Sequence, residues 1–306
     1  MTLICFRRSL VTSRRVFSVA AVIFGFAQSV FAGTAAEQTH TLKFSIRDDQ
    51  GQLIQGEQDV SGIVAFDPST GALNTPVYDA NAPAAPAGWA WSSTDLATGE
   101  QYATPQFLTW HNTTTKTNNV WDSFVQLKAA GNVDPIMTYS FSAKNNSAVN
   151  QTYTFSYGES IDPSIFGNYF VNADIAGSVT RGNLTQDAQI TPTLSKIQTL
   201  KLSTDGGLTF LNAGVDVGTT HTSSSKTNPF GTEYAEAYGN LSGINYWQFD
   251  VSFILTPNKD AAALSGSAEI SAIPEPATYA GLMGGVMLLG AMMRRRRPAI
   301  VRSVCE

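Results

Sequence analysis

Four tryptophans in the first half of the chain are the residues whose type and spacing best suit a defined chemistry, the stacking of sugar rings. They are Trp89, Trp91, Trp110 and Trp121. Flat aromatic rings pack against the apolar faces of pyranose rings, while nearby Asn and Asp side chains take the hydroxyl groups. Trp89 and Trp91 are two residues apart, so a strand would place both rings on one face. The alternative is that these rings fill a β-sheet core, and the sequence leaves both possibilities open.

No other residue set has the spacing of a metal or catalytic site. His40, His111 and His221 are far apart and lack the i, i+4 pattern of a zinc site, so we expect no metal and no cofactor. Asp48 and Asp59 lie in turn-like segments that fall short of a calcium-binding loop. Two carboxylates can hydrolyse a glycosidic bond, but nothing singles out a pair here. We therefore expect no catalytic residue.

Residues 203–210 read Ser-Thr-Asp-Gly-Gly-Leu-Thr-Phe and resemble the Asp-box, with Phe210 where that motif has Trp. In the motif, the Asp, Ser and Thr side chains hydrogen-bond a tight hairpin turn, and glycine supplies a positive φ angle. Propeller proteins repeat the motif several times, whereas this chain has one copy. The segment therefore predicts a stabilised hairpin and argues against a propeller.

The C-terminal segment combines three features in a fixed order. Pro274, Glu275 and Pro276 come first, an uncharged apolar run of 17 residues (277–293) follows, and Arg294, Arg295, Arg296 and Arg297 end the segment. At about 1.5 Å per residue, a helix of this run reaches about 25 Å, most of the way across a bilayer core of about 30 Å. The arginines favour the cytoplasmic side. A plain membrane anchor is the alternative, but it has no need for Pro-Glu-Pro.

With these features in this order, residues 274–297 resemble the PEP-CTERM sorting signal of Gram-negative bacteria, which a membrane-embedded cysteine protease called exosortase recognises. The resemblance implies a single transmembrane helix at 277–293 and a cytoplasmic tail at 298–306. It also implies exosortase as a partner, with processing near Pro-Glu-Pro. The upstream domain would then pass from an inner-membrane-anchored precursor to the cell surface or beyond.

The N-terminal segment predicts export. Arginine pairs at 7–8 and 14–15 precede an apolar run at 16–31, and Val-Phe-Ala ending at Ala32 has the small residues that signal peptidase prefers. We expect a signal peptide with a helix at 1–32 and cleavage after Ala32. Residues 13–17 also resemble the core of a twin-arginine signal, but Ser18 and Val19 stand where a hydrophobic residue and Lys follow in that signal. The general export pathway is therefore favoured.

Without its two ends the chain is strongly acidic and free of cysteine. Residues 33–273 contain 22 acidic and ten basic residues, a net charge near −12. This charge repels nucleic acids and anionic lipid surfaces, so we expect no nucleic-acid partner. Cys5 and Cys305 both lie in the terminal segments. The exported part therefore has no disulfide and no thiol nucleophile, and it is long enough to bury a core without such links.

Period-two alternation dominates residues 33–273 and predicts an all-β domain. Met137–Phe141 and Tyr153–Tyr157 alternate aromatic with polar residues, so we expect them to form an antiparallel hairpin across the polar segment 144–150. Further strands are expected at Thr41–Ile46, Val60–Phe66, Phe107–Trp110, Val120–Leu127, Ile175–Thr180, Ile197–Ser203 and Trp247–Leu255. The prediction is one antiparallel β-sandwich, jelly-roll-like, with residues 260–273 as its last edge.

These observations predict an exported, surface-sorted protein without enzymatic activity. We expect it to be a component of the extracellular polysaccharide matrix, of a biofilm or of surface adhesion. One alternative is a carbohydrate-binding module that uses the four tryptophans. A less favoured alternative is a polysaccharide-active hydrolase. The ligand and the oligomeric state stay open.

Overall fold

The computed structural model describes most of the predicted exported domain. The described residues are 40–67, 72–74, 84–85, 87–95, 99–105, 107–111, 116–117, 120–121, 123–132 and 135–273, with Gly285, Met287 and Leu288. The signal-peptide site Ala32, the Pro-Glu-Pro motif and the four C-terminal arginines lie outside them. Within these residues, no helix has the length and apolar character needed to cross a membrane. Described residues 40–273 belong to one compact unit.

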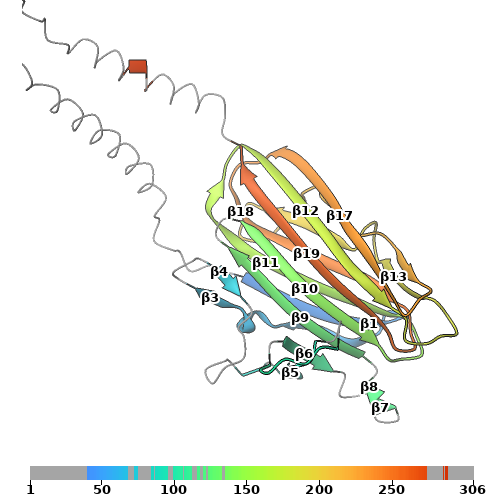
Figure 1. Cartoon of the computed structure of the whole chain (residues 1–306). Coiled ribbons are helices and arrows are strands. Elements are labelled where there is room, and N and C mark those ends of the chain that lie inside the picture. The colour runs from blue at the N-terminus through green and yellow to red at the C-terminus, as the bar shows by residue number, and fades with distance from the viewer. Residues whose placement is uncertain are drawn as a thin grey trace, which may run out of the picture. The chain divides into compact units, whose positions relative to one another are not determined.

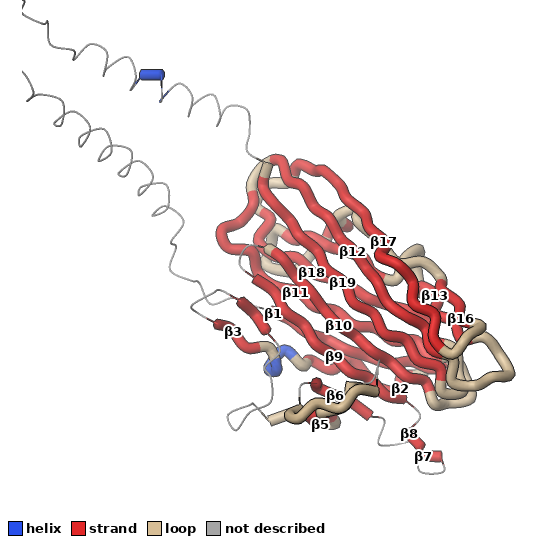
Figure 2. Tube along the Cα trace, viewed as in Figure 1, coloured by secondary structure: helices blue, strands red, loops and turns tan. Residues whose placement is uncertain are grey.

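One layer of the fold is an antiparallel sheet, here called sheet A, with the strand order β15-β14-β18-β11-β1-β2. Its strands are β1 (His40–Asp48), β2 (Leu53–Asp59), β11 (Gln151–Ile165), β14 (Gln198–Ser203), β15 (Leu211–Asn212) and β18 (Ile244–Leu255). β13 (Ala188–Pro192) also pairs with β18, and β16 (His221–Ser223) pairs with β13. Strands dominate the described chain (Figure 2).

The second layer, sheet B, has the order β17-β12-β19-β10-β9-β4-β3, and its long strands lie side by side in Figure 1. Its strands are β3 (Ala65–Asp67), β4 (Ala72–Asn74), β9 (Ser123–Asn132), β10 (Ile136–Asn145), β12 (Asn168–Thr180), β17 (Thr227–Asn240) and β19 (Asp260–Ala272). β6 (Phe107–His111) pairs with β9, and β5 (Trp89–Ser92) pairs with β6. Outside the two sheets, β7 (Lys116–Thr117) pairs with β8 (Val120–Trp121), and η1 (Ser61–Ile63) is a single 3-10 turn.

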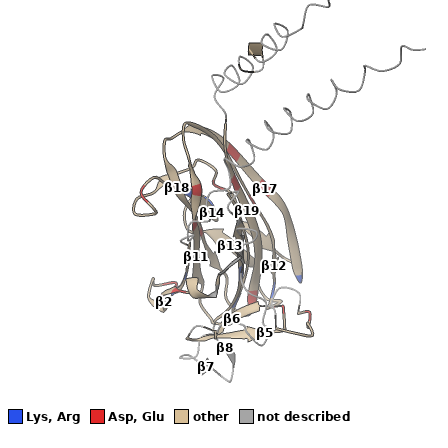
Figure 3. Ribbon diagram, turned by 90° about the vertical axis from the view of Figure 1, so that its left-hand side faces the viewer, with Lys and Arg blue, Asp and Glu red and all other residues tan. Residues whose placement is uncertain are grey.

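The two sheets pack face to face as a β-sandwich, which Figure 3 shows edge on. Alternate residues of each strand point into the space between the sheets, as period-two patterning requires. Phe141 on β10 and Phe155 on β11 stack there with their ring centroids 5.6 Å apart. Trp247 on β18 is fully buried nearby. The predicted antiparallel all-β sandwich is therefore confirmed at this level.

The predicted hairpin between residues 137–141 and 153–157 is wrong. β10 pairs with β9 and β19 in sheet B, whereas β11 pairs with β1 and β18 in sheet A. The connecting segment crosses from one sheet to the other, so the two aromatic faces meet across the core instead of lying side by side. Both strands carry large inward rings, and facing each other lets these rings fill one shared interior.

Two other predictions about strands are corrected. Residues 260–273 do not form an edge, because β19 lies between β12 and β10 with a long register on each side. Its inward residues include small ones, Ala262, Gly266 and Ala268, beside the larger Leu264 and Ile270. The expected strand at 60–66 is instead the turn η1 followed by the three-residue strand β3.

Candidate functional site

Two of the four tryptophans proposed for sugar stacking lie in the core. Trp89 on β5 and Trp110 on β6 are 6% and 4% exposed, and each ring centroid lies 5.6 Å from that of Phe44 on β1. The two residues are directly opposite each other in the β5–β6 pair. Their rings close the gap between the sheets, where burial of aromatic surface is most favourable. Neither ring is available to a sugar, so the core alternative holds for both.

The other tryptophans do not support the predicted stacking of sugar rings either. Trp91, two residues after Trp89, is half-buried against the same core. Trp121 belongs to the two-stranded β7–β8 pair, and its side chain lies outside the described part of the structure. Trp247 is fully buried, and its indole Nε1 donates to Glu159 Oε1 at 3.2 Å. Among the described side chains, the tryptophans therefore serve packing.

The Asp-box segment forms the stabilised hairpin turn that the sequence predicts. Asp205 Oδ1 accepts from the backbone nitrogens of Leu208 (3.1 Å) and Thr209 (2.9 Å), and Asp205 Oδ2 accepts from Thr209 Oγ1 at 2.6 Å. Ser203 Oγ donates to Asp205 Oδ1 at 2.7 Å. Hydrogen bonds from Ser203 and Thr209 lower the pKa of Asp205 to about 2. Groups of the same turn therefore satisfy the hydrogen-bonding capacity of the Asp205 carboxylate, and its role is structural.

The two histidines with described side chains, His40 and His221, contact different partners. His221 Nε2 lies 2.7 Å from Glu233 Oε1, and the imidazole stacks on Phe230 with a centroid distance of 3.7 Å. His40 Nε2 lies 3.0 Å from the carbonyl oxygen of Ser61. Where side chains are described, no three His, Cys, Asp or Glu residues come together in a way that could hold a metal ion.

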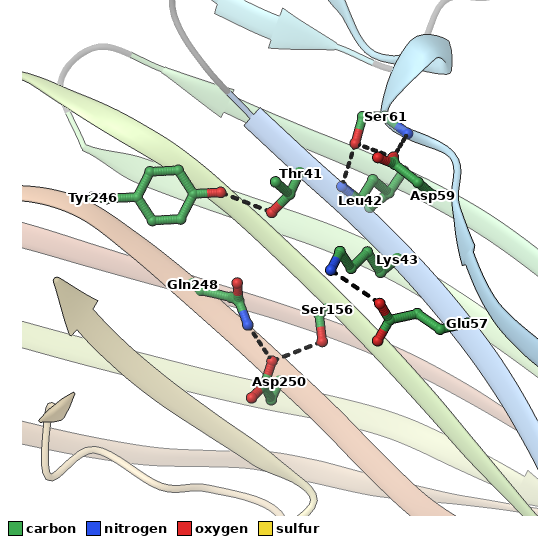
Figure 4. Close-up of polar contacts among 10 residues, drawn as sticks. All are labelled: Thr41, Leu42, Lys43, Glu57, Asp59, Ser61, Ser156, Tyr246, Gln248 and Asp250. Atoms are coloured by element: carbon green, nitrogen blue, oxygen red, sulfur yellow. Dashed lines mark hydrogen bonds and ion pairs between the residues drawn. The ribbon is translucent and has the colours of Figure 1, made fainter. Parts of the chain in front are cut away.

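The outer face of sheet A is polar, and its side chains are bonded to one another (Figure 4). Ser156 Oγ and Gln248 Nε2 both donate to Asp250 Oδ1 at 2.7 Å. Lys43 pairs with Glu57 at 3.0 Å, and Lys201 pairs with Asp250. A ligand that bound here would have to displace these internal bonds, which lowers the net gain of any new one. This face is a poor candidate for a binding site.

The outer face of sheet B, called the open face below, differs because it exposes two tyrosine rings and carries two polar side chains, Asn172 and Glu269, without a hydrogen bond in the described part of the chain. Its principal residues are Tyr234, Glu236 and Tyr238 on β17, Phe170, Asn172 and Asp174 on β12, Ser267 and Glu269 on β19, and Thr138 on β10. The strand register places them in rows across the sheet, because directly opposite residues point the same way.

Three rows of the open face follow from the register. Phe170 lies opposite Tyr238, and two residues further along β12, Asn172 lies between Glu236 on one side and Glu269 on the other. Asp174 then lies between Tyr234 and Ser267. The inward residues between them, Val171, Ala173 and Ile175, are fully buried. The core therefore holds these strands in the register that aligns the rows.

Two tyrosine rings stand out from the open face. Tyr234 is 56% exposed and Tyr238 is 70% exposed. They are four residues apart on β17, which is about 13 Å at the usual rise of a strand. Tyr238 also contacts Phe170, with ring centroids 5.1 Å apart. Neighbouring exposed rings of this kind mark a contact surface more often than a lone exposed ring does.

Hydrogen-bonding groups lie between and beside these rings. The side chains of Asn172 and Glu269 make no hydrogen bond within the described part of the chain. Tyr234 Oη donates to Glu236 Oε2 at 2.9 Å, and Ser267 Oγ donates to Asp174 Oδ2 at 2.7 Å. The bond to Glu236 raises the pKa of Tyr234, so its hydroxyl stays protonated at neutral pH. The open face thus presents rings, donors and acceptors together on one flat surface.

Residues of the open face were not found from the sequence. β17 was not predicted as a strand, because its inward positions are Ala235, Ala237 and Gly239, which carry little hydrophobic signal. The usable signal was the alternation Tyr234-Ala-Glu-Ala-Tyr238, with large side chains on one face and small ones on the other. Such a pattern suits an edge strand whose large residues face water.

No family model matches the chain, and no curated protein matches it. Among solved structures, the carbohydrate-binding module TmCBM61 in complex with beta-1,4-galactotriose aligns over 48% of this chain and 88% of its own, with 12% identity and a TM-score of 0.24. The enzymatically active domain of tailspike protein 4 of bacteriophage CBA120 aligns over 60% of this chain and 20% of its own, with 7% identity and a TM-score of 0.21. The K3 adhesin domain of Lys-gingipain from Porphyromonas gingivalis aligns over 62% of this chain and 94% of its own, with 10% identity and a TM-score of 0.21. Likenesses at this level carry no argument about function.

Proposed function

We propose that this chain is an exported, non-catalytic protein that binds extracellular polysaccharide and is sorted to the cell surface as part of the matrix, of a biofilm or of an adhesive layer. The single observation that carries the binding function is the open face, where Tyr234 and Tyr238 expose their rings beside the unengaged side chains of Asn172 and Glu269. Sugars need both features, because a pyranose has an apolar face and a rim of hydroxyl groups.

The delivery part of the proposal rests on the two termini. The basic and apolar N-terminal segment ending at Ala32 would be removed by signal peptidase, and the Pro-Glu-Pro, apolar and arginine segment at 274–297 would be recognised by exosortase. Intact mass spectrometry of protein recovered from the envelope and the medium tests both. We expect a chain that starts at Gly33 and ends near Pro276. A mass that retains residues 277–306 would overturn sorting and leave a plain anchor.

The binding part is tested with the purified protein and a panel of soluble polysaccharides, by isothermal titration calorimetry. We expect Tyr234→Ala and Tyr238→Ala to weaken binding about 5- to 10-fold each, since aromatic stacking contributes about 1 kcal/mol. Leu208→Ala is the matched control, because Leu208 is 84% exposed but lies on the Asp-box turn of sheet A. This control should bind like the original protein.

Two outcomes would contradict the binding proposal. One is an original protein that binds no polysaccharide in the panel. The other is an unchanged affinity in the Tyr234→Ala, Tyr238→Ala double variant. In the same samples we expect no new reducing ends, because the proposal assigns no catalytic residue. Release of reducing ends would instead support a polysaccharide hydrolase.

A further inference from the structure

We infer that the open face selects polysaccharides whose sugars carry free amino groups, that is, cationic amino-sugar polymers, over neutral and uronate polymers. This inference rests on the proposed function, because it names the class of polysaccharide that the same surface takes. Its basis is that negatively charged carboxylates lie among the exposed tyrosine rings.

Three carboxylates lie among the aromatic residues of the open face. Glu236 and Glu269 flank Asn172 on the two neighbouring strands, so they are two strand spacings apart, about 10 Å. Asp174 lies two residues further along β12. The outward Lys128 on β9 is the nearby basic residue, and it lies in a row beyond Ser140. The open face therefore carries a net negative charge within a domain that is itself acidic.

No lysine, arginine or histidine of the described residues forms an ion pair with these three carboxylates. The ion pairs of the described residues join Lys43 to Glu57 and Lys201 to Asp250 on sheet A, and His221 to Glu233 beside β17. Sheet A therefore supplies lysines to its outward acidic groups, whereas Glu236, Asp174 and Glu269 have none within 4.0 Å in the part of the chain that the structure describes. The exposed carboxylates of Glu236 and Glu269 and the half-buried Asp174 repel one another, and a bound cation relieves this.

A protonated amino sugar matches both properties of the surface. Its ammonium group donates charge-assisted hydrogen bonds to carboxylates, and it is also attracted to the faces of tyrosine rings. Its pyranose ring offers the apolar face that Tyr234 and Tyr238 can stack on, and its hydroxyl groups reach Asn172. A uronate polymer would place its carboxylates against Glu236 and Glu269, and this repulsion disfavours it.

The test compares matched polymers on the purified full chain, by calorimetry at a pH where the sugar amines are protonated. The probes are partly deacetylated chitin oligosaccharides, their fully N-acetylated counterparts, alginate oligosaccharides and polylysine of similar charge. We expect the deacetylated oligosaccharide to bind about 5- to 20-fold more tightly than the acetylated one, with the preference falling as salt rises. We expect alginate to bind most weakly.

Substitutions test whether the carboxylates of the open face cause the preference for the deacetylated oligosaccharide. In the Glu236→Gln, Glu269→Gln double variant we expect the affinity for the deacetylated oligosaccharide to fall more than that for the acetylated one, so that its advantage drops to within about 2-fold. Glu57→Gln is the matched control, because Glu57 is an exposed strand carboxylate on sheet A. It should keep the full preference.

The outcomes separate this inference from the proposed function. Equal affinity for both chitin oligosaccharides would overturn the inference, while the binding function would stand. Polylysine binding as tightly as the amino-sugar polymer would also overturn it, because charge alone would then explain the effect. Tighter binding of alginate would do the same. If no oligosaccharide binds, the proposed function fails with it.

Discussion

Gly158 on β11 lies beneath the ring of Tyr246, and a single methyl group there should destabilise the domain. A Cβ at this position would lie 2.7 Å from Tyr246 Oη, 2.8 Å from its Cε1 and 2.9 Å from the carbonyl oxygen of Trp247. The Asp-box turn also lies close to the ring, because a Cβ built on Gly207 would be 3.0 Å from Tyr246 Cδ1. Thr41 Oγ1 also holds Tyr246 Oη at 2.7 Å.

The cost of Gly158→Ala follows from these contacts. Overpacking costs about 1–3 kcal/mol, and loss of the hydrogen bond to Thr41 about 0.5–1.5 kcal/mol. Alanine has less conformational entropy than glycine in the unfolded chain, which stabilises the folded state by about 0.4–1 kcal/mol and offsets part of this cost. The net loss is about 2 kcal/mol of unfolding free energy, which corresponds to a fall in Tm of about 4–8 °C for a domain of this size.

Thermal unfolding followed by far-UV circular dichroism and urea titration measures this loss. Gly56→Ala on β2 is the matched control, since no atom lies within 4 Å of its added Cβ, and its Tm should change little. A Tyr246→Phe background should reduce the cost of Gly158→Ala by about 0.5–1 kcal/mol, because one clashing atom is gone. If the Tm of Gly158→Ala equals that of Gly56→Ala, the described packing of Tyr246 is wrong.

Two further predictions concern the predicted sugar-stacking and Asp-box residues. Trp110→Ala should lower the unfolding free energy by about 3–5 kcal/mol, because it leaves a cavity in the core beside Phe44. The fraction of the variant that is folded should keep its affinity for polysaccharide. A fully folded variant with lost affinity would argue that Trp110 contacts sugar. Asp205→Asn should destabilise the domain above about pH 4. The folded pKa of Asp205 is about 2, below the ordinary 3.8 of an aspartate, so its contribution is complete above the unfolded pKa and is lost as pH falls toward 2. Urea titrations of the original protein and of Asp205→Asn from pH 6 to pH 2 should therefore converge at the acid end, and a constant difference between them would contradict this assignment.

Local patterns predicted much of the fold. The alternation in Thr41–Ile46, Ile197–Ser203 and Trp247–Leu255 corresponds to β1, β14 and β18, because each strand has one face in a shared core. The spacing of Ser203, Asp205 and Thr209 predicted the hairpin turn, since the side-chain bonds of Ser203 and Asp205 join residues within four positions of the chain. Interactions this local depend little on the rest of the molecule.

The partner of each strand could not be predicted in the same way. An alternating strand has the same pattern whether it pairs with its neighbour in sequence or faces it from the other sheet, so β10 and β11 were expected to form a hairpin and instead lie in opposite sheets. β19 was expected at an edge for a similar reason, because its Ala, Ser and Gly residues carry little hydrophobic signal.

The sequence by itself determined that residues 33–273 are acidic, cysteine-free and built from strands, because composition and period-two alternation are properties of the chain alone. Only the tertiary structure decided which aromatic residues face water. Trp89 and Trp110 have the ring type that suits sugars, yet the gap between the sheets buries them, while Tyr234 and Tyr238 remain exposed on β17. The reason is that burial depends on what packs against a face, and that is set by strands distant in sequence.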